Sequence, residues 1–170
     1  MSTLHVENLK GLSSGGNANK IIVPSGQTID ASAGILVPSA GQVVQVVRMT
    51  PTNTAHTNST TSYTKSNLAL SITPKYANSL IKIEMSCVIL NQGSQLNMKL
   101  YRNGSSISID TQIHGDYDNN GQYTTTALMF TDLPNTTSST EYALYSAINS
   151  GSNTSYVYRE QHMLLTEIKQ

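Results

Sequence analysis

The chain has 170 residues, enough for one domain with a sizeable core plus an appendage. Ten basic residues balance ten acidic ones, and charged residues make up only 12% of the chain, about half the usual share. Without a basic excess the chain cannot neutralise many phosphates, so we expect no nucleic-acid partner. About two residues in five are Ser, Thr, Asn or Gln, which is typical of repetitive β proteins that act outside the cell.

Residues 1–20 predict an extended arm. Leu4, Val6 and Leu9 alternate once with polar positions, and a Gly-, Ser- and Asn-rich stretch then interrupts any regular element. Such a segment is ordered only where a partner holds it. The first residues are polar and do not resemble a signal peptide, and no apolar run is long enough for membrane insertion, so we expect synthesis in a cytoplasm.

Residues 21–47 contain a near-repeat. Ile22-Val23-Pro24-Ser25-Gly26-Gln27 is followed by Leu36-Val37-Pro38-Ser39-Ala40-Gly41-Gln42. The two copies are either stacking units of a short intertwined β segment or merely two similar turns. The aliphatic residues exceed what so thin a segment can bury alone, so three copies would have to cover one another. The sequence therefore predicts a trimer interface at Ile22, Val23, Ile35, Leu36, Val37, Val44 and Val46.

Residues 48–170 predict an all-β head domain. Apolar residues alternate with polar ones over 79–90, which places Ile81, Ile83, Met85, Cys87 and Ile89 on one face of a strand. No window has the spacing of an amphipathic helix of several turns. We expect strands at 43–50, 66–73, 79–90, 95–102, 105–111, 123–132, 140–149 and 154–168. Strands spaced by about a dozen residues predict a jelly-roll-like β-sandwich.

Two connections in this domain are distinctive. Asn103-Gly104 lies between alternating apolar segments and predicts a tight hairpin. Residues 50–66 form a polar segment that is either a long surface connection or a recognition loop.

Catalytic patterns are lacking in the sequence. His5, His56, His114 and His162 are scattered without metal-ligand spacing, and no nucleophile elbow or phosphate-binding Gly-rich loop occurs. Cys87 is the only cysteine and reads as a small buried apolar residue. We therefore expect a protein that is not an enzyme and needs no cofactor.

One local motif could bind a metal. Asp116-Tyr117-Asp118-Asn119-Asn120-Gly121 spaces oxygen side chains as a Ca²⁺ loop does, which makes Asp116, Asp118 and Asn120 a weak Ca²⁺ candidate. Ala127 stands where an EF-hand would need its Glu, and the same residues suit an ordinary solvated turn.

Tyrosines dominate the aromatic residues. A Tyr ring offers an apolar face for a sugar and a hydroxyl to hydrogen-bond it, so Tyr117 and Tyr123 are candidates for contact with a host surface glycan. Tyr is equally a favoured strand residue, and most of the other tyrosines fall within expected strands.

Several segments together resemble the structural proteins of bacteriophage particles, in particular tail-fibre-like proteins of cyanobacterial phages. The resemblance rests on short motifs spread over most of the chain: Leu4-x-Val6-x-Asn8-Leu9-Lys10-Gly11, Val23-Pro24-Ser25-Gly26-Gln27, Thr73-Pro74-Lys75, Leu100-Tyr101-Arg102-Asn103-Gly104, Asp132-Leu133-Pro134 and Leu164-Leu165-Thr166-Glu167-Ile168.

The resemblance implies a trimeric, non-enzymatic virion protein that is attached through its first residues and carries a globular head. Leu4, Val6 and Leu9 would then dock on other virion structural proteins, and the head could serve host attachment. A capsid decoration or cement protein and a lectin-like receptor-binding module remain the alternatives, because only two shaft-like units are present.

Overall fold

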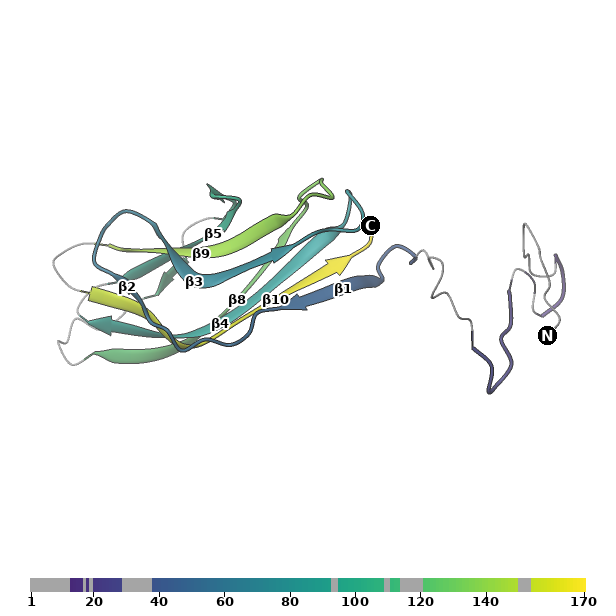
Figure 1. The fold of residues 1–170 in the computed structure, drawn as a ribbon, viewed down its shortest axis with the longest axis horizontal. Coiled ribbons are helices and arrows are strands. Elements are labelled where there is room, and N and C mark those ends of the chain that lie inside the picture. The colour runs from purple at the N-terminus through teal and green to yellow at the C-terminus, as the bar shows by residue number, and fades with distance from the viewer. Residues whose placement is uncertain are drawn as a thin grey trace. The chain divides into compact units, whose positions relative to one another are not determined.

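The computed structural model describes residues 13–16, 18, 20–28, 38–92, 95–108, 111–113, 121–149 and 154–170 (Figure 1). The chain divides into two compact units, residues 1–37 and 38–170, which are treated separately below. Every helix or strand in the described ranges is a β-strand, as the alternation in the sequence predicts. None of the described residues forms a helix that could cross a lipid bilayer.

The strands of the second unit match the expected ones closely. In chain order, the strands that the structure describes are β1 (Val43–Arg48), β2 (His56–Asn58), β3 (Thr64–Ile72), β4 (Leu80–Gln92), β5 (Leu96–Arg102), β6 (Ser105–Ser106), β7 (Thr111–Ile113), β8 (Gln122–Asp132), β9 (Thr140–Ile148) and β10 (Thr154–Ile168). They form two antiparallel sheets, which makes the unit a β-sandwich (Figure 1). The first sheet has the order β1-β10-β4-β8, with β2 also paired to β10. The second has the order β3-β9-β5-β6, with β7 also paired to β5.

The core lies between the two sheets. The face of β4 that the alternation selects is buried, from Ile81 at one end to Ile89 at the other. It packs with side chains from both sheets that are almost inaccessible to solvent: Leu68, Ile72, Leu96, Met98, Leu100, Tyr142, Leu144, Val157, Met163 and Leu165. Because each strand buries alternate residues, the remaining residues of each strand point away from the core. The sandwich therefore has two outer faces.

The expected hairpin is present. Asn103 and Gly104 have φ angles of 48° and 79°, the two positive values that a type I′ turn requires. Arg102 pairs with Ser105 across it. The predicted strand 105–111 is shorter than expected, however, because β6 ends at Ser106 and the backbone N–H of Leu100 bonds to the Ser108 hydroxyl instead of a further strand residue.

The polar segment 50–66, expected to be either a long surface connection or a recognition loop, contains the short strand β2. Strand β10 extends well beyond the end of β1, so backbone groups in its first half need other partners. β2 supplies them from His56 to Asn58, and an isolated bridge joins Thr52 to Gln161 beside the bulge in β10.

A buried carboxylate secures β1 and the segment before β4. Glu167 is fully buried and accepts hydrogen bonds from the Ser79 hydroxyl (2.6 Å), Gln45 Nε2 (2.6 Å) and the backbone N–H groups of Lys75 (2.8 Å) and Tyr76 (3.1 Å). Burial alone would raise the pKa of Glu167, but these four hydrogen bonds outweigh burial and hold the pKa below its usual value.

Each copy of the near-repeat contains a turn. Pro24–Gln27 and Ser39–Gln42 are each closed by a backbone hydrogen bond, and each has Gly third, with φ angles of 80° and 83°, as in a type II turn. Described residues 20–28 contain no strand. The second turn already belongs to the sandwich unit, because Gly41 N–H bonds to the carbonyl of Lys169. The sandwich unit thus begins at Pro38, ahead of the predicted start at residue 48.

Candidate binding surface

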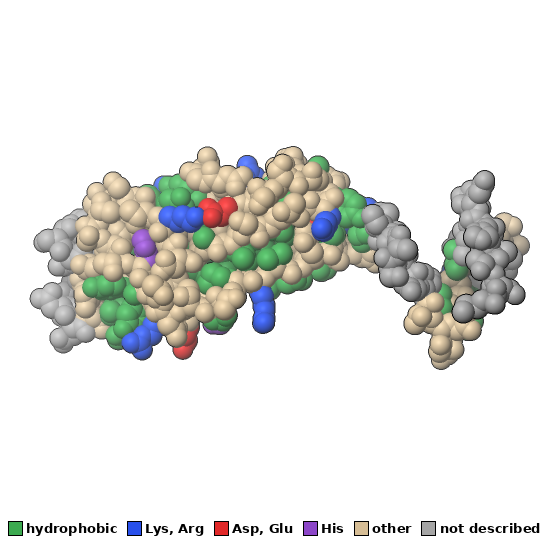
Figure 2. Space-filling model, viewed as in Figure 1, with side chains coloured by type: hydrophobic (Ala, Val, Ile, Leu, Met, Phe, Trp, Pro, Cys, Tyr) green, Lys and Arg blue, Asp and Glu red, His purple; other side chains and the backbone are tan. Residues whose placement is uncertain are grey.

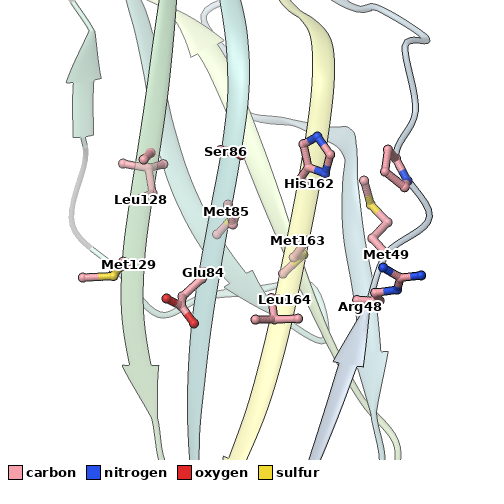
Figure 3. A pocket seen from close by; sticks show the side chains of 12 residues that line it. Arg48, Met49, Glu84, Met85, Ser86, Leu128, Met129, His162, Met163 and Leu164 are labelled. Carbon is pink, nitrogen blue, oxygen red and sulfur yellow. The ribbon is translucent and has the colours of Figure 1, made fainter.

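The outer face of the first sheet carries an unusual row of side chains. Register pairs Arg48 of β1 with Leu164 of β10, Leu164 with Glu84 of β4, and Glu84 with Met129 of β8. Paired residues of neighbouring strands point to the same side of a sheet. Figure 3 shows these four side chains side by side across the strands. We call this outer face of β1, β10, β4 and β8 the apolar face.

Large apolar side chains on this face are open to solvent. Met129 is 70% exposed, Val46 55% and Val43 57%. Val43 belongs to the same face because it pairs with Ile168, and Val46 because it pairs with Thr166. Val43 and Val46 lie on the edge strand β1 and Met129 lies on β8 at the opposite edge, so the exposed apolar side chains span the width of this face.

A shallow groove of about 450 Å³ crosses the apolar face (Figure 3). Most of its lining is apolar, and the polar groups come from a few residues only. The lining residues are Arg48, Met49, Pro51, Glu84, Met85, Ser86, Ala127, Leu128, Met129, His162, Met163 and Leu164. The groove is thus a place where an apolar group can leave water, with few donors or acceptors to orient a polar ligand.

Charge on the apolar face is sparse and of both signs. Lys82 and Glu84 form an ion pair at 2.9 Å between Nζ and a carboxylate oxygen. In the part of the chain that the structure describes, Arg48 has no acidic partner. Figure 2 shows the same scarcity of charge on the side of the molecule that it displays.

The outer face of the second sheet carries charged and aromatic side chains that pair with one another. Lys65 of β3 and Glu141 of β9 form an ion pair at 2.7 Å. Tyr101 of β5 stacks on Tyr145 of β9 with ring centroids 3.8 Å apart. Among the described residues, the exposed large apolar side chains of the strands all belong to the first sheet. The described part of the second sheet therefore presents an ordinary solvated surface.

Three tyrosines gather where β8 begins and β10 starts. Tyr123 and Tyr158 have ring centroids 5.7 Å apart, Tyr156 and Tyr158 6.3 Å apart, and the Arg159 guanidinium lies 4.5 Å from the Tyr158 ring centroid. Tyr123 is 64% exposed. We call these four residues the tyrosine cluster. Ring faces next to a guanidinium can hold a flat or sugar-like ligand by stacking and hydrogen bonding.

The structure places only some of the residues singled out from sequence. Ile22 and Val23 lie in the first unit and are exposed; Val46 is exposed on the apolar face, and Val44 is half-buried in β1. Tyr123 is exposed in the tyrosine cluster. The remaining predicted site residues lie outside the described ranges: Leu4, Val6, Leu9, Ile35, Leu36, Val37, Asp116, Tyr117, Asp118 and Asn120.

Met129 and Leu164 are not among the site residues that the sequence predicts. The signal was present, because Ala127-Leu128-Met129-Phe130 is apolar on both sides of β8 instead of alternating. A strand with one buried and one solvated face should alternate. Loss of alternation indicates that the second face also requires cover.

The titratable residues of the described ranges are mostly isolated from one another or buried. No cluster of three or more His, Cys, Asp or Glu side chains that could hold a metal occurs among them. Burial raises the pKa of the Cys87 thiol to about 12, so it is a poor nucleophile at neutral pH. Burial also lowers the pKa of His56, whose Nε2 lies 3.2 Å from the Thr64 hydroxyl.

The sequence matches no protein-family model and no curated protein. Among solved structures, the chain is similar to dimeric latent PorU from Porphyromonas gingivalis, with 11% identity over 91% of this chain and 15% of that one and a TM-score of 0.39. It is also similar to the EclA C-terminal domain, a sugar-binding protein, with 16% identity over 88% of this chain and 92% of that one and a TM-score of 0.35. A third similar structure is that of infectious bursal disease virus, Gx strain, with 13% identity, coverage of 86% and 42%, and a TM-score of 0.34.

Proposed function

We propose that this chain is a non-enzymatic structural protein of a bacteriophage particle. It forms a short homotrimeric fibre that is made in the host cytoplasm, docks on other virion proteins through residues 1–20, and displays the β-sandwich outward. The proposal extends the resemblance to tail-fibre-like proteins; a capsid decoration protein would use the same arm and head at a different place on the particle.

One observation carries the proposal: apolar side chains are exposed in both units. Ile21, Ile22 and Val23 in the first unit are 39% or more exposed, and the apolar face adds further exposed residues. Covering one such side chain completely contributes about 1.5–3 kcal/mol. A chain built to act alone would gain nothing from leaving them open, whereas a component of an assembly buries them on binding.

The docking step is tested by removing residues 1–20 and measuring incorporation into particles. We expect purified particles to contain the full chain, and the shortened chain to be absent from them while remaining folded in the cell extract. The Ser71→Ala variant is the control, because Ser71 is exposed on β3 of the second sheet, and it should be incorporated normally. Equal incorporation of the shortened and full chains would disprove docking through the arm.

A lectin-like receptor-binding role is a second candidate, which the tyrosine cluster favours. Tyr123→Ala removes an exposed ring and should reduce binding to host cells or glycans by about tenfold or more, while the chain is still incorporated into particles through residues 1–20. Tyr101→Ala is the matched control, because Tyr101 lies on the other sheet and is stacked on Tyr145. Unchanged binding by Tyr123→Ala would remove the cluster from consideration as a receptor contact.

A further inference from the structure

We propose that the apolar face is the surface through which copies of this chain contact one another, so that the sandwiches themselves hold the oligomer together. This rests on the proposed function, which requires self-association, and it names the partner as a second copy of the chain. The contact is centred on the row formed by Arg48, Leu164, Glu84 and Met129.

The first argument is that the two outer faces of one sandwich differ. Solvent would favour polar side chains equally on both, yet Met129, Val46 and Val43 are exposed on the first sheet, while the second sheet offers the Lys65–Glu141 pair. The difference is explained if only the second sheet stays in water. The groove then accepts apolar side chains of the neighbouring copy.

The second argument is area. The 11 residues of β8 span roughly 36 Å and β4 and β10 are longer, whereas the 6 residues of β1 span roughly 20 Å, so four strands of about 4.8 Å width each give a face of roughly 600 Å². A stable protein interface hides about 800 Å² on each partner. The face therefore has the size for another folded chain, whereas a small ligand would cover only the groove and leave Val43 and Val46 exposed.

The third argument is charge. A strongly acidic or basic face would repel its own copy, but the chain has no net charge and this face carries both signs. Arg48 lies on β1 without an acidic partner in the described ranges, and Glu84 lies two strands away with a partly exposed carboxylate. In a ring of copies, the β1 edge of one face meets the middle of the next, so Arg48 of one copy can join the Lys82–Glu84 pair of its neighbour. Such pairing fixes register between copies more than it adds affinity.

The test uses the full chain and measures its mass in solution by light scattering over a dilution series. We expect the unmodified chain to be an oligomer. Met129→Lys places a charge in the contact and should raise the dissociation constant by about tenfold or more. Ser71→Lys is the matched control, because Ser71 is exposed on β3 of the other sheet, and it should leave the mass unchanged. Circular dichroism confirms that both variants keep their strands.

A second measurement needs no variant. Mild peroxide oxidation followed by mass spectrometry should modify Met129 slowly in the oligomer and as fast as a solvent-exposed methionine after dilution to single chains, since its side chain is 70% exposed in one copy.

A monomeric unmodified chain, an oligomer that Met129→Lys leaves intact, or rapid oxidation of Met129 within the oligomer would each overturn the inference. Incorporation into particles through residues 1–20 is measured separately, so the proposed docking can succeed where this inference fails.

Discussion

The two outer faces of the sandwich share one core and yet meet their surroundings in opposite ways. The second sheet covers itself with the Lys65–Glu141 ion pair and the Tyr101–Tyr145 stack. The first sheet leaves Met129 and Val46 open. Because folding requires only that each sheet bury its inner side, the difference between the outer sides is not needed for the fold. We therefore attribute the difference between the outer faces to function.

The largest expected change in the free energy of unfolding comes from comparing a buried methionine with an exposed one on the two sides of the first sheet. Met85→Ala empties a buried position and should lower the free energy of unfolding by about 2–4 kcal/mol at any protein concentration. Met129→Ala should act only at concentrations at which copies associate, because Met129 is exposed in a single copy. Urea unfolding at several protein concentrations measures both. A large effect of Met129→Ala in dilute solution would show that Met129 supports the single chain.

The next effect concerns the anchoring of β1, the edge strand of the apolar face. Glu167→Gln removes the charge and turns one acceptor into a donor facing N–H and O–H groups, so it should lower the free energy of unfolding by about 2–3 kcal/mol.

The pH dependence has a definite sign. The pKa of Glu167 is lowered in the folded state, so its stabilisation is fully present above the unfolded carboxyl pKa of about 4.3 and is lost as the pH falls through the lower folded value. The difference between Glu167→Gln and the unmodified chain should therefore shrink in acid. A constant difference from neutral to acidic pH would contradict this account.

A small effect is expected on the second sheet. Lys65→Ala breaks an ion pair between two side chains that are 41% and 38% exposed, so it should change the free energy of unfolding by less than about 1 kcal/mol. Added salt should reduce even that change. If Lys65→Ala weakened self-association, the second sheet would also take part in the contact between copies, contrary to the proposal.

The smallest effect is expected at Cys87, which reports on the core beneath both faces. Its thiol is buried and its pKa is raised to about 12, so a thiol reagent at neutral pH should leave the folded chain unmodified and label it only after unfolding. Rapid labelling under native conditions would show that the two sheets separate.

Most of the sandwich could be predicted from sequence because the information is local. Period-two alternation in β4 identifies the buried face, and Asn103-Gly104 fixes a hairpin with two positive φ angles. β2 could not be predicted, since His56–Asn58 is polar and becomes a strand only because β10 offers it backbone partners. In the near-repeat, the turn at Gly26 follows from the Pro and Gly residues, whereas the short strands expected beside it are not found in residues 20–28.

The candidate surface was predicted less well, because it depends on which side of each strand faces the core. Val46 was expected to be an association residue, and it lies exposed on the apolar face. Leu164 and Met129 come from strands far apart in the sequence, and only the register of β10 and β8 with β4 brings them into one row. That register results from tertiary packing, which a single sequence does not reveal.

The path of the chain into the sandwich also determines how it resists tension. Gly41 and Gln42 bond to Lys169, and β1 then runs antiparallel along β10 from Val43 to Arg48. A pull applied ahead of Pro38 along the strand direction would stress these ladder hydrogen bonds together in shear, and not one after another as in unzipping. Tension between the residues ahead of Pro38 and the far end of the sandwich would thus load the domain along its mechanically stronger direction.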